Sequence, residues 1–94
     1  MKFNDKIDSM REDIIKATQE LIQIPSVESA PQEGAPFGTG IRECLDKTLE
    51  LGSRLGFKTE NFDGYAGHIE YGEGEEIVGI LVHVDVVPEG SGWN

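Results

Sequence analysis

An almost unbroken apolar run near the end of the 94-residue sequence constrains the fold most strongly. From Ile77 to Val87 the chain reads Ile-Val-Gly-Ile-Leu-Val-His-Val-Asp-Val-Val, and Pro88 ends the run. Because successive side chains of a strand point to opposite faces, a run that is apolar at neighbouring positions predicts a strand buried on both faces. Such strands lie in sheets that helices cover on each side. The run therefore predicts an α/β fold with this segment as a central strand.

The residues before this run predict two helices. Between residues 4 and 23, apolar side chains recur at spacings of three and four, which places them on one helical face. These side chains are Ile7, Met10, Ile14, Ala17 and Leu21. We expect Asn4 to cap the start of this helix and Pro25 to end it. A loop rich in proline and glycine over 25–40 leads into a second amphipathic helix over 39–55, which Gly56 follows as the expected C-cap.

Two shorter strands precede the apolar run. Residues 57–62 and 65–71 flank Asp63-Gly64, a dipeptide typical of tight hairpin turns, and a turn over 72–75 leads to 77–87. The sequence therefore predicts two helices and about three strands. Gly52 lies inside the second helix, where glycine costs about 1 kcal/mol relative to alanine, and a close packing contact would explain it.

The charge balance excludes some classes of partner. Eighteen acidic and eight basic residues give a net charge of −10 and a pI near 4.4, which disfavours nucleic acid and anionic membrane surfaces. The single cysteine, Cys44, excludes an internal disulfide and is expected to pack in the core. No stretch approaches the roughly 20 apolar residues that span a bilayer. We therefore expect an acidic cytoplasmic protein without a nucleic-acid or membrane partner.

His83 and Asp85 interrupt the apolar run and are the candidate functional residues. Positions two apart on a strand share a face, and active sites of α/β sheets gather beyond the carboxyl ends of strands. A carboxylate in apolar surroundings needs a partner. Three partners would satisfy Asp85: the imidazole of a metal-bound His83, a residue outside this chain, or His83 in a purely structural pair. His68, in the predicted hairpin, is expected to be an exposed or edge histidine.

The string from His83 to Trp93, His-Val-Asp-Val-Val-Pro-Glu-Gly-Ser-Gly-Trp, resembles the first metal-site signature of the M20 metallopeptidase family. The segment Leu21–Val27 resembles the opening helix and Ile-Pro-Ser-Val turn of that family, and the hairpin from Gly64 to Gly72 resembles its PepV-type bacterial dipeptidase branch. The resemblance implies that residues 1–94 are the amino-terminal part of a three-layer, zinc-peptidase-like catalytic domain. The lid domain and the remaining metal ligands would lie outside these residues.

The same resemblance implies a function. His83 would ligate one of two divalent metal ions, zinc or alternatively manganese or cobalt, and Asp85 would be the catalytic aspartate beside it. The full enzyme would hydrolyse dipeptides through a metal-activated water, with a small peptide as its partner; the sequence does not predict the oligomeric state. Because a catalytic zinc takes about three protein ligands, residues 1–94 alone are expected to be inactive.

Two other functions stay open at this point. N-acyl amino acid deacylases and aminoacylases of the same family share the signature, and the residues that separate them from dipeptidases lie outside this sequence. The third hypothesis is a small, non-enzymatic acidic α/β binding module in which His83 and Asp85 form a structural pair.

Overall fold

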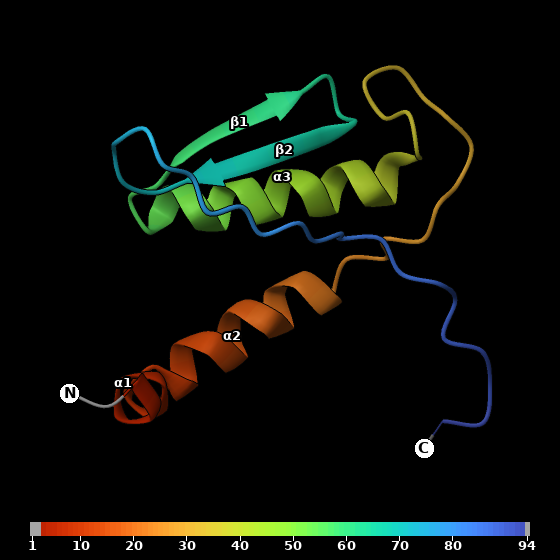
Figure 1. Cartoon of the computed structure of the whole chain (residues 1–94). Coiled ribbons are helices and arrows are strands. Elements are labelled where there is room, and N and C mark those ends of the chain that lie inside the picture. The colour runs from red at the N-terminus through yellow and green to blue at the C-terminus, as the bar shows by residue number, and fades with distance from the viewer. Residues whose placement is uncertain (1–2, 94) are drawn as a thin grey trace.

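A computed structural model of the chain describes residues 3–93 and shows three helices and a two-stranded sheet. In chain order the elements are α1 (Phe3–Ser9), α2 (Arg11–Ile22), α3 (Thr39–Arg54), β1 (Lys58–Phe62) and β2 (Ala66–Glu70). Figure 1 shows the β1–β2 hairpin lying against α3, with α1 and α2 on the other side of α3. The predicted combination of helices and a sheet, as a partial α/β domain, is confirmed, although the sheet has two strands where about three were expected.

The prediction of one helix over 4–23 is wrong, because the helix is interrupted at Met10. Met10 has φ −99° and ψ 5°, and its N–H donates to the carbonyl of Ile7 at 3.0 Å. The Ser9 hydroxyl donates to the Lys6 carbonyl, a local bond that competes with the helical pattern. Asn4 lies inside α1 and does not cap it. No residue of either helix is buried.

The second predicted helix, α3, is confirmed and ends as expected at Gly56. Gly56 has φ +90°, and its N–H donates to the Ser53 carbonyl at 3.0 Å. The N–H of Phe57 donates to the Gly52 carbonyl at 3.0 Å, which completes a Schellman motif. The face of α3 that points inward supplies most of the small core, consisting of Ile41, Cys44, Leu45 and Gly52. The burial of Cys44 confirms its expected packing role.

The predicted hairpin is also confirmed. β1 and β2 pair antiparallel from Lys58 opposite Glu70 to Phe62 opposite Ala66. Asp63 and Gly64 both have positive φ, 57° and 77°, as a tight hairpin turn requires. The turn is closed by the N–H of Tyr65, which donates to the Phe62 carbonyl at 3.0 Å.

Two glycines allow the hairpin to approach α3 closely. A Cβ at Gly52 would lie 2.8 Å from Cδ1 of Ile69, so the β2 side chain occupies the space that a helical side chain would fill. A Cβ at Gly67 of β2 would lie 3.1 Å from both terminal methyls of Leu49 on α3. The packing contact that would explain a glycine inside the helix is therefore present.

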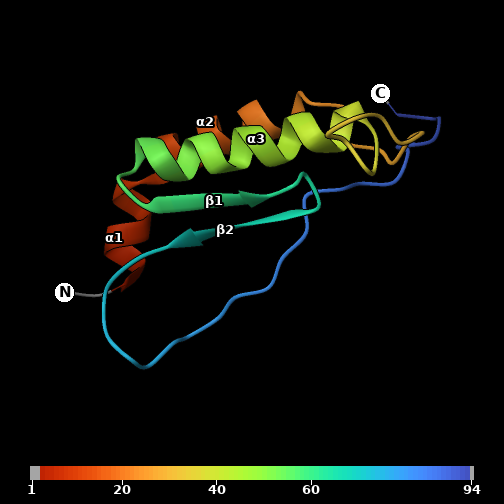
Figure 2. The ribbon, with the colours of Figure 1, turned by 90° about the horizontal axis from the view of Figure 1, so that it is seen from above.

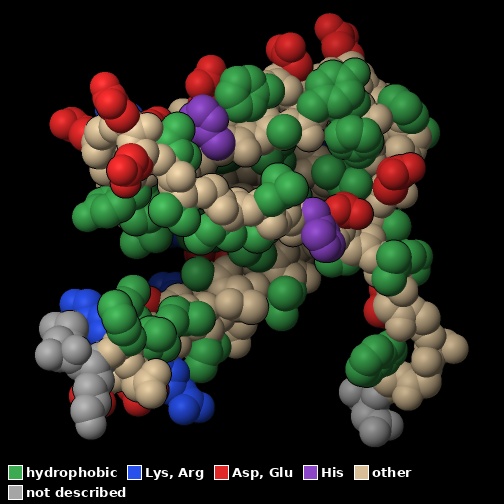
Figure 3. All heavy atoms as spheres, viewed as in Figure 1, with side chains coloured by type: hydrophobic (Ala, Val, Ile, Leu, Met, Phe, Trp, Pro, Cys, Tyr) green, Lys and Arg blue, Asp and Glu red, His purple; other side chains and the backbone are tan. Residues whose placement is uncertain are grey.

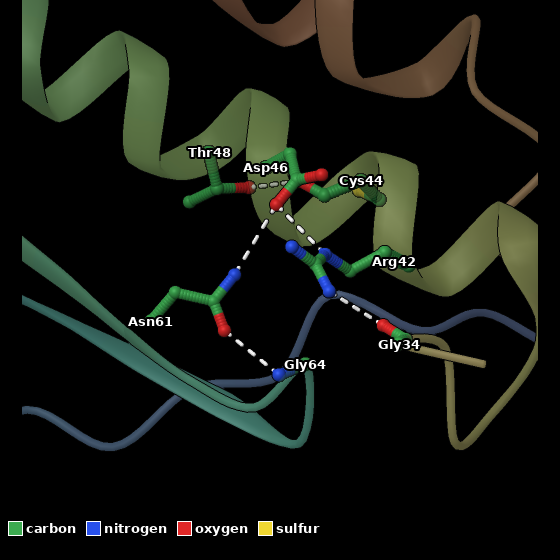
Figure 4. Close-up of polar contacts among 7 residues, drawn as sticks. All are labelled: Gly34, Arg42, Cys44, Asp46, Thr48, Asn61 and Gly64. Atoms are coloured by element: carbon green, nitrogen blue, oxygen red, sulfur yellow. Dashed lines mark hydrogen bonds and ion pairs between the residues drawn. The ribbon is translucent and has the colours of Figure 1, made fainter.

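A polar network joins α3 to the hairpin turn and to the loop before α3 (Figure 4). The Arg42 guanidinium donates to Asp46 Oδ1 at 3.0 Å and to the Gly34 carbonyl. The Asn61 amide donates to the same Asp46 oxygen at 3.2 Å, and its own oxygen accepts the Gly64 N–H at 2.8 Å. Asn61 thereby connects the tight turn to the helix through side-chain bonds in both directions.

The prediction of a buried central strand over 77–87 is wrong for this structure. The segment is extended but belongs to no strand, and Leu81 is 100% exposed. Its regular pairing is limited to one parallel bridge between Val86 and Val27. A strand needs the backbone groups of a neighbouring strand, and Figure 2 shows the segment standing away from β1 and β2, which pair only with each other.

Candidate metal-binding site

The structure brings the side chains of His83 and Asp85 together. Nδ1 of His83 lies 3.2 Å from Oδ1 of Asp85 and 3.1 Å from the Asp85 backbone oxygen. When Nδ1 carries the proton and donates it to Asp85, the neutral imidazole presents Nε2 as its metal-binding nitrogen. This pair thus has the arrangement of a metal-ligating histidine supported by a carboxylate.

Both side chains are open to solvent. The His83 side chain is 81% exposed and the Asp85 side chain 57% exposed. The expectation that they lie within a buried strand is therefore wrong here, for the same reason that the segment is not a strand. The alternative of a core histidine satisfied by Asp85 does not describe this structure either, because such a histidine would be buried.

The residues present fit one ligand of a metal centre but not a complete centre. Among residues 3–93, no three histidine, cysteine, aspartate or glutamate side chains gather closely enough to hold a metal ion. A catalytic zinc takes about three protein ligands, and this pair supplies one imidazole and its supporting carboxylate. The chain can therefore contribute to a metal site but does not assemble one from its described side chains.

The other histidine belongs to the hairpin surface. Nε2 of His68 lies 3.8 Å from Oε2 of Glu60, the residue opposite it on β1, and the His68 side chain is 50% exposed. Its ring is tilted against Phe62, with centroids 5.4 Å apart. This position confirms the expectation of an exposed histidine.

An apolar cleft of about 520 Å³ separates the candidate site from the body of the fold. Its walls come from α3, from residues 64–69 of the hairpin and from residues 80–85, which include His83 and Asp85. Figure 3 shows a hollow on this face with hydrophobic side chains around it. The segment bearing His83 and Asp85 thus lies over the core without packing into it.

Sequence reasoning missed the contact that fastens the site segment to the fold. The N–H of Val86, next to Asp85, donates to the Ser26 carbonyl at 3.1 Å, and Val86 pairs with Val27 in the parallel bridge. Ser26 itself is 3% exposed. The two motifs behind the family resemblance, around Pro25 and after His83, therefore meet in space, and their joint presence was the signal that could have revealed this contact.

The chain is similar in sequence to bacterial proteins named as dipeptidases. It is 50% identical over 95 residues to the protein named "Putative dipeptidase YtjP" of Bacillus subtilis, a match that covers 99% of this chain and 20% of the relative. It is 43% identical over 94 residues to a protein of Staphylococcus epidermidis named "Putative dipeptidase", covering 98% of this chain and again 20% of the relative. The chain therefore spans about a fifth of the length of these curated relatives.

No family model matches the sequence. Within residues 3–93, none of the helices has the length and apolar character needed to cross a membrane.

Proposed function

We propose that this chain is part of a larger metal-dependent dipeptidase of the M20 type, in which His83 ligates a metal ion and Asp85 supports it. The observation that carries the proposal is the 3.2 Å His83–Asp85 pair in a chain that is 50% identical to a relative named as a dipeptidase. The His-x-Asp-Val-Val-Pro and Ile-Pro-Ser-Val motifs support the family assignment. The relatives' length, about five times that of this chain, supports the proposal that further ligands come from other parts of the enzyme.

Each residue has a distinct part in this proposal. Asp85 accepts the Nδ1 proton of His83, which fixes the tautomer, orients the ring and makes Nε2 a better ligand. Imidazole suits zinc, with manganese or cobalt as alternatives. A divalent metal pair, when bound, supplies an activated water for attack on the peptide bond. This chain's own contribution is to hold Nε2 in place, and we expect residues 1–94 alone to bind zinc weakly and to hydrolyse nothing. A cytoplasmic location stays a prediction.

The test uses the protein isolated from its native source with antibodies against residues 1–94. We expect a mass several times 10.3 kDa and hydrolysis of dipeptides that a chelator abolishes and zinc restores. His83→Ala should abolish this hydrolysis, whereas His68→Ala, the matched histidine control on the hairpin, should leave it unchanged.

Three outcomes would contradict the proposal in different ways. A 10.3 kDa protein with no hydrolytic activity would favour the small binding module. Hydrolysis of N-acyl amino acids without hydrolysis of dipeptides would favour the deacylase alternative. Full dipeptidase activity in the His83→Ala protein would remove His83 from the site.

A further inference from the structure

We propose that Gly40 is a positioning residue for the candidate metal site. It has no side chain, which lets the segment Pro25–Val27 lie against the start of α3, and that segment holds the backbone beside Asp85. The inference rests on the proposed function, because its importance depends on His83 being a ligand.

Gly40 is required by space and not by backbone conformation. It is the second residue of α3 and is not among the residues with positive φ. A Cβ built at Gly40 would lie 2.1 Å from the Pro25 carbonyl oxygen and 3.1 Å from its carbonyl carbon. A separation of 2.1 Å is far inside van der Waals contact, and the opposing atoms are backbone. Any side chain here must therefore displace the Pro25 segment.

The displaced segment is the one that holds Val86. The Ser26 N–H donates to the Ile24 carbonyl at 2.9 Å, and the Ser26 carbonyl accepts the Val86 N–H at 3.1 Å. Ser26 is almost fully buried, so the peptide that carries this acceptor has little room to move. The contacts thus run from Gly40 through Pro25 and Ser26 to Val86.

The bond to Val86 governs where the site segment lies. In the part of the chain described after β2, residues 71–93, it is the one backbone hydrogen bond to the rest of the fold. Val86 is adjacent to Asp85, whose carboxylate lies 3.2 Å from the His83 ring. Figures 1 and 2 both show the segment passing beside the loop that follows α2 at this point. Losing this attachment would free Asp85 and His83 together.

The substitution Gly40→Ala separates positioning from helix stability because the two effects have opposite directions. Alanine has a higher helix propensity than glycine, so an effect confined to α3 would raise the thermal midpoint. Displacement of Pro25–Val27 would instead detach Val86. Gly79→Ala is the matched control, because Gly79 lies in the site segment and a Cβ there meets nothing within 4 Å.

The experiment is NMR on the 94-residue chain with Mn²⁺ as a paramagnetic probe. The wild-type chain should show a nuclear Overhauser effect between Val27 and Val86, and Mn²⁺ should broaden the His83 imidazole signals before those of His68. In Gly40→Ala we expect the Val27–Val86 effect to vanish. The Mn²⁺ concentration that half-broadens the His83 signals should rise about tenfold, as when the support of a ligand is lost. Gly79→Ala should match the wild type in both measurements.

Each remaining outcome has a definite meaning. If Gly40→Ala keeps the Val27–Val86 effect and the wild-type Mn²⁺ response, the inference is overturned. Val86→Pro removes the N–H donor without touching Gly40, so it should reproduce both losses even if Gly40→Ala fails to fold; a wild-type Mn²⁺ response in it also overturns the inference. If Mn²⁺ does not favour His83 in the wild type, the assignment of His83 as a ligand fails, and the Val27–Val86 measurement alone then decides the Gly40 contact.

Discussion

Replacing Gly52 by alanine tests how α3 and the hairpin pack. Two opposing effects set the magnitude. Alanine gains about 1 kcal/mol over glycine inside a helix. The new Cβ would lie 2.8 Å from Cδ1 of Ile69 and 3.1 Å from both Cγ1 and Cγ2. Cδ1 can rotate away, but the branched Cγ atoms are fixed by χ1, and overpacking of this kind costs about 1–3 kcal/mol. We therefore expect Gly52→Ala to lower the free energy of unfolding by up to about 2 kcal/mol.

A double-mutant cycle with Ile69→Ala isolates the contact. In the Ile69→Ala background the clash is gone, so the same Gly52→Ala change should raise the free energy of unfolding by about 1 kcal/mol. The coupling between the two positions should then be about 1–3 kcal/mol. Urea unfolding followed by circular dichroism measures all four proteins. If Gly52→Ala stabilises both backgrounds equally, the coupling is zero and the close packing of Ile69 on Gly52 is refuted.

Three further predictions concern the polar contacts and the exposed run. The Arg54 guanidinium, 2.9 Å from Glu20, lowers the pKa of this carboxyl below its ordinary value of 4.5. The pair should therefore stabilise the fold above pH 4.5 and lose that effect as pH falls through the lowered pKa, so urea midpoints of wild type and Glu20→Gln should converge in acid. Asn61→Ala should cost about 1–3 kcal/mol in urea unfolding by removing two hydrogen bonds, and Asn61→Asp should retain the bond to Gly64. Leu81→Lys, at a fully exposed site, should raise solubility in a precipitation assay. The free energy of unfolding measured in urea should change by less than about 0.5 kcal/mol.

The local parts of the fold could be predicted because their causes lie within a few residues. The turn at Asp63-Gly64 depends on two positive φ angles, and the end of α3 depends on the positive φ of Gly56. Each is a preference of the residue types themselves. The interruption at Met10 could not be predicted in this way. Apolar spacing continues across it, whereas the bonds that accompany it, from Ser9 to the Lys6 carbonyl and from Met10 to the Ile7 carbonyl, are not visible in that spacing.

The central strand illustrates the limit of an apolar pattern. The run from Ile77 to Val87 indicates what surroundings the segment requires, namely a strand on each edge and cover on each face. The described residues offer it the single bridge at Val86. The spacing of His83 and Asp85 nevertheless predicted that their side chains meet, because positions two apart share one face of an extended segment. The contacts of Gly40 with Pro25 and of Ser26 with Val86 join distant parts of the chain, and no local rule indicates them.

Residues 77–87 lack a pairing strand, and the His83–Asp85 pair lacks further metal ligands. The described residues supply neither, and both observations support the proposal that the chain is part of a larger enzyme. A strand pairing with residues 77–87 would hold the segment extended, and the period of two would then keep His83 and Asp85 on one face. The bridge to Val27 already sets the direction of pairing at the carboxyl end of the segment. The metal ligation proposed for His83 would hold the same backbone through the His83 side chain. Ordering of the strand and assembly of the metal site should therefore be coupled, so that each raises the stability of the other.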